Sequence, residues 1–164
     1  MIAQRYRLVE QLAHGGMGSI WKAHHEQLDA PVAVKFMTTA LDAQLTARFE
    51  REAKACARMN SPHVVRVHDY GTVDDQGAVG SGLPFMVMEL LNGEDLSARL
   101  RRQRRLTIPE LLPIALHIAK GLTAAHDAGI IHRDLKPANV FIAQDGREEI
   151  VKLLDFGIAR ETEA

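Results

Sequence analysis

Residues 130–142, IIHRDLKPANVFI, place a dense polar cluster between two apolar runs. An ordinary surface turn needs only residues such as Gly, Asn or Ser. Three charges and an amide between two segments that prefer burial must instead be held by specific partners, because burying them unpaired is costly. The pattern therefore indicates a loop with a chemical task, built from His132, Arg133, Asp134, Lys136 and Asn139.

The composition around this loop is that of an ordinary globular protein. The chain has 164 residues, of which 46% are hydrophobic and 25% charged, and its formal net charge is −1. A charge so near zero gives no indication of nucleic-acid binding. The single cysteine, Cys56, excludes an internal disulfide and is typical of a reducing compartment. No apolar run is long enough for a membrane segment or a signal peptide, so we expect a cytoplasmic protein.

The first half of the chain is predicted to be mainly strands. Residues 5–13 and 19–28 flank a glycine-rich turn, and residues 30–37, APVAVKFM, form a β-branched run. A helix is expected from about Leu41 to Met59. Two further strands follow, VVRVHDYGTV and LPFMVMELL, joined by a polar, glycine-rich loop.

From Gly93 onward the pattern changes to helix. Residues 93–105 and 107–129 both have helical character, and the second run begins with a capping box from Thr107 to Glu110. Pro113 is expected to kink the first turns of that helix. A hairpin around Asp145-Gly146 is predicted within VFIAQDGREEIVKLL, so the chain belongs to the α+β class.

Two opposite charges fall where the pattern predicts burial. Lys35 interrupts the apolar strand VAVKFM, and Glu52 lies in the apolar stripe of the helix, together with Leu45, Phe49, Cys56 and Met59. A partly buried Lys35–Glu52 ion pair would explain both positions. Alternatively, Lys35 extends to solvent and Glu52 marks the edge of the stripe.

Two further segments suggest a phosphate ligand and a metal ion. Gly15, Gly16 and Gly18 allow a backbone that turns its N–H groups toward phosphate oxygens, although they also suit a simple turn. Asp155 ends an apolar strand and precedes Phe156 and a glycine. That position suits a ligand of Mg²⁺, or an ordinary strand-ending turn.

Taken in order, these segments resemble the eukaryotic-type protein kinase signature. The matching motifs are AHGGMG, VAVK, the helix with Glu52, HRDLKPAN and DFG. The stretch RFEREAKACARMNSPHVVRVHDYG is similar to bacterial serine/threonine kinases, and Lys136, two residues after Asp134, is the serine/threonine pattern. The resemblance implies a kinase-like fold: an antiparallel-sheet N-lobe with one helix over residues 1–92, and the first, mostly helical part of a C-lobe over residues 93–164.

The resemblance also implies transfer of the γ-phosphate of ATP to serine or threonine residues of a protein substrate. Asp134 would orient the attacking hydroxyl or accept its proton, and Lys136 would stabilise charge on the transferred group. Asn139 and Asp155 would hold Mg²⁺. Lys35, held by Glu52, would contact the α- and β-phosphates.

For the nucleotide, the resemblance implies that the backbone of residues 15–18 covers the phosphates; Ala13 stands where the family has its first loop glycine. Adenine and the hinge would be served by Ile20, Ala33, Phe141, Met88 (gatekeeper), Glu89 and Leu91. We expect His132 to pack beneath Phe156 and Arg133 to pair with a phosphorylated activation loop. The arginines from Arg99 to Arg105 form a docking patch or a solvated helix face.

A complete kinase domain continues well past DFG, whereas this sequence ends at Ala164. Three hypotheses therefore compete. The chain is a serine/threonine kinase that is incomplete for stand-alone activity, a nucleotide-binding interaction module without phosphate transfer, or a truncated product that folds poorly. A partner chain or self-association would cover the apolar face of the helix near residues 110–128.

Overall fold

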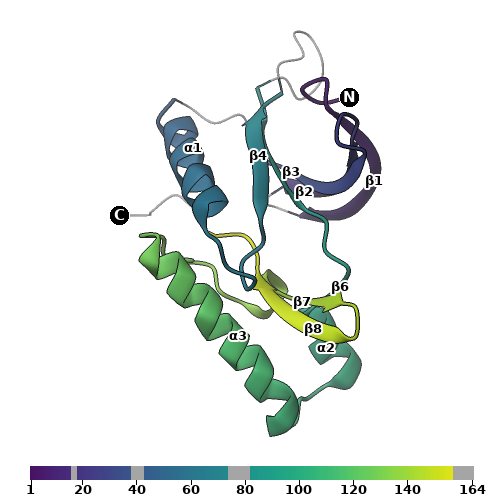
Figure 1. Cartoon of the computed structure of the whole chain (residues 1–164), viewed down its shortest axis with the longest axis vertical. Coiled ribbons are helices and arrows are strands. Elements are labelled where there is room, and N and C mark those ends of the chain that lie inside the picture. Colours follow the sequence, from purple (N-terminus) through teal and green to yellow (C-terminus); the bar gives the residue numbers. More distant parts are fainter. Residues whose placement is uncertain (16–17, 38–42, 74–81, 157–164) are drawn as a thin grey trace. The chain divides into compact units, whose positions relative to one another are not determined.

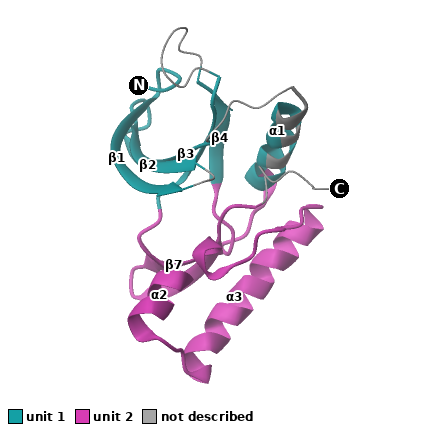
Figure 2. Ribbon diagram, turned by 180° about the vertical axis from the view of Figure 1, so that it is seen from behind, with its two compact units in different colours: residues 1–57, 67–90, 159–164 teal, residues 58–66, 91–158 magenta. Residues whose placement is uncertain are grey.

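A computed structural model of the chain describes residues 1–15, 18–37, 43–73 and 82–156 (Figure 1). Within the first helix the side chains of residues 43–45, 48 and 52 are not described. The chain forms two compact units, one of residues 1–57 and 67–90 and the other of residues 58–66 and 91–158 (Figure 2). Each unit is considered by itself, and the predicted lobe boundary at residue 92 stays a prediction.

The first unit is built on a five-stranded antiparallel sheet in the order β1-β2-β3-β5-β4. Its strands are β1 (Tyr6–Gly15), β2 (Gly18–His25), β3 (Ala30–Phe36), β4 (Val67–Thr72) and β5 (Pro84–Glu89). All five strands were expected from the alternating and β-branched runs, and the antiparallel sheet is confirmed. Short connections join β1 to β2 and β2 to β3, which is what antiparallel neighbours require.

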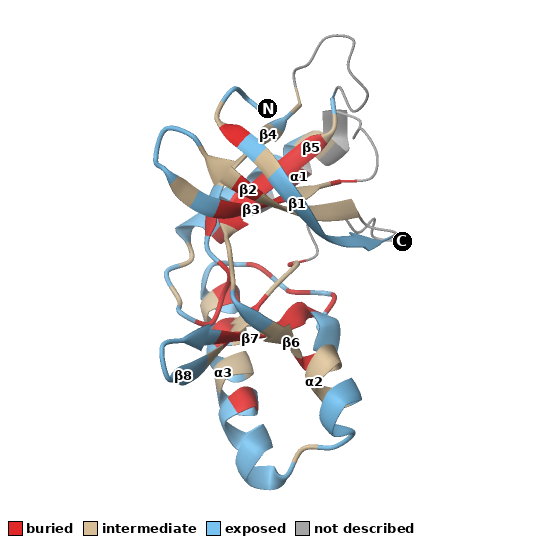
Figure 3. Ribbon diagram, turned by 90° about the vertical axis from the view of Figure 1, so that its right-hand side faces the viewer, coloured by how far each residue is buried: buried red, intermediate tan, exposed pale blue. Residues whose placement is uncertain are grey.

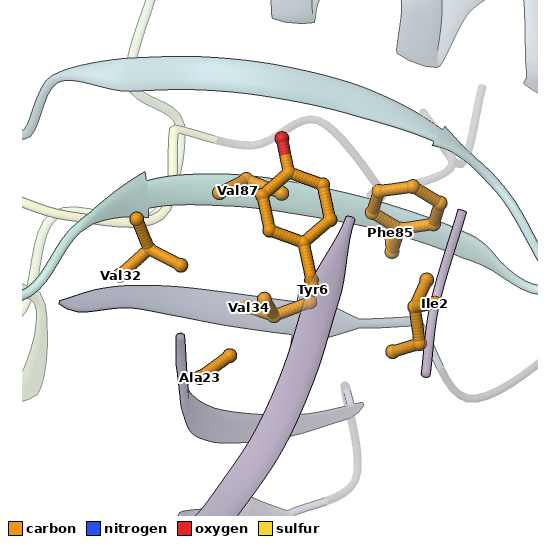
Figure 4. Packing of buried hydrophobic residues seen from close by; sticks show 7 residues of the cluster. All are labelled: Ile2, Tyr6, Ala23, Val32, Val34, Phe85 and Val87. Carbon is orange, nitrogen blue, oxygen red and sulfur yellow. The ribbon is translucent and has the colours of Figure 1, made fainter. Parts of the chain in front are cut away.

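One face of this sheet carries the hydrophobic core of the unit (Figure 4). Val34 of β3 lies opposite Val87 of β5, and both are fully buried. Because successive side chains alternate between faces, Lys35 lies on the other face, opposite Met86. The core cluster consists of Ile2, Tyr6, Ala23, Val32, Val34, Phe85 and Val87.

Helix α1 (Ala43–Arg58) confirms the helix predicted from about residue 41 to 59 over the part that is described. Phe49 and Cys56 are buried, as the apolar stripe requires. The ring centroids of Phe49 and Tyr70 lie 6.3 Å apart, and the two ring planes meet at 73°. Helix α1 therefore packs near β4. The side chains of Leu45 and Glu52 lie outside the described residues.

The second unit pairs two helices with a three-stranded antiparallel sheet in the order β6-β7-β8. Its elements are β6 (Gly93–Asp95), α2 (Leu96–Gln103), α3 (Ile108–Asp127), the short 3₁₀ helix η1 (Pro137–Asn139), β7 (Val140–Asp145) and β8 (Glu148–Leu153). The hairpin prediction is confirmed: β7 and β8 meet at a tight turn in which Gly146 has φ 63°, a conformation that favours glycine.

The prediction of a helix starting at Gly93 was wrong by three residues. Gly93 to Asp95 form β6 and pair with β7. Asp95 then caps α2, because its side chain accepts a hydrogen bond from the Ala98 N–H at 2.8 Å. An aspartate at this position satisfies a backbone donor of the first helical turn, so the helix begins after it.

Helix α3 has the predicted capping box between Thr107 and Glu110 and continues unbroken through Pro113. Ile114, Gly121 and Ala125 form its buried positions, whereas much of the remaining surface is exposed (Figure 3). The exposed apolar side chains are Ile108, Leu111, Leu112 and Leu116. No helix in the described part of the chain is long and apolar enough to cross a membrane.

Candidate functional site

The polar loop before β7 is organised around the Asp134 carboxylate. Asp134 and Asn139 are both buried, with 8% and 5% of their surface exposed. The Asn139 side-chain amide donates to the Asp134 carbonyl oxygen at 2.8 Å and to its carboxylate at 3.2 Å. A buried carboxylate needs such donors, so the amide fixes both the loop backbone and the direction of the acid.

His132 is structural, as expected. Its Nδ1 accepts a hydrogen bond from the Asp134 N–H at 3.2 Å, and its Nε2 lies 2.7 Å from the Leu154 carbonyl oxygen. Because a carbonyl can only accept, Nε2 carries the proton and Nδ1 does not. The imidazole also packs on Phe156, with ring centroids 4.6 Å apart, which confirms the predicted contact.

Lys136 supplies a cation beside the acid. Its Nζ lies 3.5 Å from Asp134 Oδ2, and about half of its side chain is exposed while that of Asp134 is not. An ammonium on a flexible stem at the rim of a buried carboxylate can meet an incoming anion. The 132–139 motif therefore brings an anion, a cation and an amide together within one loop.

The segment after β8 runs directly past this loop. The Leu154 N–H donates to the Asn139 carbonyl oxygen at 2.9 Å, so Asp155 follows a residue bonded to Asn139. Asp155 and Arg133 have φ values of 49° and 61°. Non-glycine residues in this region are strained, and such strain concentrates at functional sites.

The donor set suits a hard cation. The amide nitrogen of Asn139 is committed to Asp134, which turns its side-chain oxygen toward other partners. An amide oxygen and the carboxylate of Asp155 are the kind of ligands Mg²⁺ prefers. Among the residues that the structure describes, no three His, Cys, Asp or Glu side chains gather around a common point. A magnesium ion here would thus take further ligands from a bound phosphate or water.

In the first unit, the glycine-rich turn is held close to β3. Gly15 pairs with Gly18, and Ala13 with Ile20. A Cβ on Gly18 would lie 1.9 Å from the Phe36 carbonyl oxygen, so only glycine fits there. Gly16 lies outside the described residues.

The other predicted nucleotide residues of the first unit lie on neighbouring strands. Lys35 is opposite Ile20 on one side and Met86 on the other, and Ala33 is opposite Met88. Glu89 ends β5. The Lys35–Glu52 ion pair stays a prediction, because the Glu52 side chain is not described. In the second unit, Phe141 lies half-buried on β7, opposite Asp95, and Leu91 is half-buried before β6.

The arginines of α2 do not form one uniform face. Only 13% of the Arg99 side chain is exposed, and its guanidinium makes two hydrogen bonds to Glu149, at 2.9 and 2.7 Å, and one to Glu94. Arg101, Arg102, Arg104 and Arg105 are exposed. Both earlier interpretations were therefore wrong for Arg99, because it bridges α2, β6 and β8 inside the unit.

A pair of histidines was missed altogether. His63 and His117 lie 54 residues apart in the sequence, and their ring centroids lie 4.1 Å apart. Burial, followed by the neighbouring His63 and Lys120, lowers the pKa of His117. No local sequence pattern predicts this contact, because it depends on how α3 packs against residues 58–66.

The comparisons with known proteins agree with this arrangement. The sequence profile of the protein kinase domain matches residues 6–164, and the chain belongs to the protein kinase domain family.

The individual relatives that the chain matches are named serine/threonine-protein kinases. The chain is 39% identical over 165 residues to the serine/threonine-protein kinase PknA of Mycobacterium tuberculosis, covering 99% of this chain and 37% of PknA. It is 42% identical over 159 residues to PknH of the same organism, covering 96% of this chain and 24% of PknH. It is 39% identical over 166 residues to the serine/threonine-protein kinase pkn3 of Myxococcus xanthus, covering 99% and 29%. The chain thus spans well under half the length of these relatives.

Proposed function

We propose that this chain carries out, or contributes to, ATP-dependent phosphorylation of serine and threonine residues in proteins. The observation that supports this most directly is the buried Asp134 carboxylate, held by Asn139 and lying 3.5 Å from Lys136. Phosphoryl transfer needs positioning and charge compensation more than covalent chemistry. A fixed acid beside a mobile cation supplies both.

In this proposal, Asp134 accepts a hydrogen bond from the substrate hydroxyl and orients it for attack on the γ-phosphorus. Its burial and its two hydrogen bonds from Asn139 limit its motion, which is the preorganisation that transition-state stabilisation requires. Lys136 places positive charge near the transferred group. Because its side chain is half-exposed, Lys136 can turn from Asp134 to the phosphate, while the Asn139 amide still donates to the buried carboxylate.

Asn139 and Asp155 would hold magnesium through their side-chain oxygens. The hydrogen bond from Leu154 to Asn139 supports this assignment, since it keeps the two ligands on adjacent backbone segments. When bound, Mg²⁺ neutralises charge on the phosphate oxygens. The positive φ of Asp155 is consistent with a carboxylate held in a specific direction.

The nucleotide itself would be bound by the residues that the kinase resemblance implies. Lys35, held by Glu52, would contact the α- and β-phosphates, and the backbone of residues 15–18 would cover them. The buried, apolar Ala33 and Met88 are suitable neighbours for a base. The proposed adenine and hinge residues are Ile20, Ala33, Met88, Glu89, Leu91 and Phe141, and Ala13 belongs to the glycine-rich loop.

The protein substrate, the signalling role and the cytoplasmic location are part of the same proposal. The names of the relatives support serine/threonine specificity, as does Lys136. The exposed apolar side chains of α3 support cover by another polypeptide segment or a second copy of the chain. Ile108 and Leu112 of this helix are 72% and 62% exposed.

The test combines phosphate transfer with nucleotide binding. Transfer of labelled γ-phosphate from Mg·ATP to a generic basic protein should be lost in Asp134→Asn and kept in Asp145→Asn, an exposed aspartate in the β7–β8 turn. A thermal melt should show stabilisation by Mg·ATP, about 2.7 kcal/mol at a hundredfold excess over Kd, and Asp155→Ala should abolish it. Stabilisation without any transfer would favour the interaction module, and no cooperative melt would favour the poorly folded product.

A further inference from the structure

The outer edge of β8 is paired partly by backbone groups and partly by histidine side chains. β8 is the last strand of its sheet, and an edge strand presents unpaired N–H and C=O groups. At Leu153 these groups find main-chain partners: its N–H donates to the His63 carbonyl oxygen at 2.9 Å, and its carbonyl oxygen accepts from the Val65 N–H at 3.0 Å. The segment containing His63 therefore meets the edge at one parallel bridge, between Val64 and Leu153.

Two residues earlier, at Val151, histidine side chains take over this role. The Val151 N–H donates to His117 Nδ1 at 3.2 Å, and the Val151 carbonyl oxygen lies 3.0 Å from His63 Nδ1. The two imidazoles lie at 31° to each other with centroids 4.1 Å apart. We call His63, His117 and the Val151 peptide groups between them the histidine clamp.

The packing of α3 holds the clamp in place. Gly121, one turn after His117, is buried, and a Cβ there would lie 2.6 Å from the His63 carbonyl oxygen. The helix backbone thus touches the segment that carries His63. This close approach fixes the two histidines relative to each other through the main chain, so the ring contact does not depend on flexible side chains alone.

The clamp responds to protons at one of its two members. A backbone N–H can only donate, so His117 Nδ1 must be unprotonated to accept from Val151. His63 Nδ1 faces a carbonyl oxygen and must carry a proton, which both the neutral and the charged ring can provide. Protonation of His117 at Nδ1 therefore breaks a hydrogen bond, whereas protonation of His63 at Nε2 does not.

The charged surroundings of His117 come from every element packed around it. Lys120 lies on the same helix, and His63 lies against the ring. The cavity of about 420 Å³ that His117 lines also has Arg99, Arg102, Glu110 and Glu149 in its wall. Burial, followed by the neighbouring His63 and Lys120, lowers the pKa of His117 below its usual 6.5. The clamp is therefore closed at neutral pH and opens as the pH falls below the lowered pKa of His117.

The same strand leads to the catalytic loop. Three residues after Val151, Leu154 donates its N–H to the Asn139 carbonyl oxygen and accepts from His132 Nε2 at 2.7 Å. Asp155 follows immediately. A shift of the β8 edge is thus transmitted through the backbone to the residues around Asp134.

We propose that His63 and His117 are positioning residues for phosphate transfer, which hold β8, and with it Asp155, against the catalytic loop until His117 takes up a proton. The catalytic meaning of this clamp rests on the function proposed above. Its structural part rests only on the hydrogen bonds of Val151, and the two parts are tested separately.

The structural test follows backbone amide signals by NMR from about pH 7.5 to 5.5, across the usual histidine range. In the unaltered chain, the amide signals of Val151, Leu154 and Asp155 should shift together as the pH falls. The pH midpoint of this shift should equal the midpoint at which the His117 ring nitrogens titrate. In His117→Asn, whose amide oxygen accepts from Val151 at any pH, this common shift should be absent. His126→Asn, an exposed histidine of the same helix, should behave like the unaltered chain.

Different midpoints for His117 and Val151, or an undiminished shift in His117→Asn, would overturn the clamp. The comparison of midpoints needs no variant, so it decides the matter even if His117→Asn does not fold.

The catalytic test measures kcat and KM for Mg·ATP over the same pH range. Below the pKa of His117, kcat/KM of the unaltered chain for Mg·ATP should fall by up to about tenfold per pH unit, because Asp155 is no longer held against the loop. His117→Asn should remove this acid limb. An acid limb unchanged in His117→Asn would overturn the positioning role. If the unaltered chain transfers no phosphate at any pH, the proposed function has failed, and the NMR result still decides whether the clamp exists.

Discussion

The side chain of Asn139 bonds both the main-chain oxygen and the carboxylate of Asp134, at 2.8 and 3.2 Å. One amide therefore shapes the backbone of the loop and compensates its buried charge. The relationship is reciprocal, because the same contacts orient the Asn139 oxygen that we assign to magnesium. In the proposed mechanism, Asn139 thus has a structural and a chemical role at once.

Replacing Asn139 should accordingly affect stability as well as activity. Asn139→Ala removes the donor of a buried carboxylate, and hydrogen bonds to charged groups contribute about 1.5–3 kcal/mol. We expect a loss of that size in the free energy of unfolding, measured with urea, and loss of phosphate transfer. Asn92→Ala, at an exposed position, is the control. A stability equal to that of the unaltered chain would contradict the importance of this contact.

The two described glycines of the β1–β2 turn should respond differently to alanine. In Gly18→Ala the new Cβ meets the Phe36 carbonyl oxygen, and the φ of 139° is unfavourable as well. We expect a loss of more than about 2 kcal/mol. Gly15→Ala has no heavy atom within 4 Å and should change stability by less than about 0.5 kcal/mol. Urea denaturation of both variants tests this, and equal losses would argue against the close approach of β2 to β3.

Tyr6 links the start of β1 to β4. Its hydroxyl donates to Asp69 at 2.7 Å, and its ring is buried. Because the acceptor is a carboxylate, Tyr6→Phe should cost about 1.5–3 kcal/mol at pH 7, measured by urea unfolding. Tyr70→Phe, a half-exposed tyrosine, serves for comparison.

The same tyrosine predicts an alkaline effect. Burial, and then the bond to Asp69, raises the pKa of Tyr6 from 10.0 to about 12. A raised pKa means that the folded state prefers the protonated hydroxyl, so this contribution is complete below pH 10 and is lost as the pH rises toward 12. The stability difference between the unaltered chain and Tyr6→Phe should therefore shrink above pH 10. A difference independent of pH would show that Tyr6 ionises as freely as in the unfolded chain.

Arg99 joins α2 to the β-sheet of its unit through Glu94 and Glu149. Arg99→Met should lower the melting temperature at pH 7, because Glu149 loses its arginine partner and Glu94 keeps only Arg102. The hydrogen bond from Arg99 lowers the pKa of Glu149, and bonds from Arg102 and Arg99 lower that of Glu94. Their stabilising contribution is present above the ordinary value of 4.5 and is lost as the pH falls below it.

Melts at pH 7 and at acidic pH should therefore show a difference between the unaltered chain and Arg99→Met that narrows in acid. Arg105→Met, at an exposed position, should melt normally at both. A constant difference for Arg99→Met would indicate that packing of the arginine stem, and not its charge, is what matters.

The regular parts of the fold could be predicted because their signals are local. Alternation identified the strands, the capping box marked the start of α3, and Asp145-Gly146 marked the hairpin. β6 could not be predicted this way. Gly93, Glu94 and Asp95 have low strand propensity, and they are extended only because β7 offers them backbone partners.

The candidate site was predicted as far as its motifs are contiguous. The spacing of Asp134, Lys136 and Asn139 within one loop predicted that their side chains would lie together, and in the structure they do. Arg99 and the two histidines of the clamp depended on tertiary packing. Arg99 has the sequence context of its exposed neighbours, and only the position of Glu149 on β8 distinguishes it.

The use of side chains to close a strand edge has an evolutionary consequence. Backbone pairing along β8 can be altered only by moving a whole segment, but at Val151 it depends on two individual residues. A histidine codon becomes an asparagine codon by a single nucleotide change, and asparagine can still accept the Val151 hydrogen bond. In the clamp that we propose, sensitivity to acid is thus a trait that selection can add or remove at one codon, without rebuilding the fold.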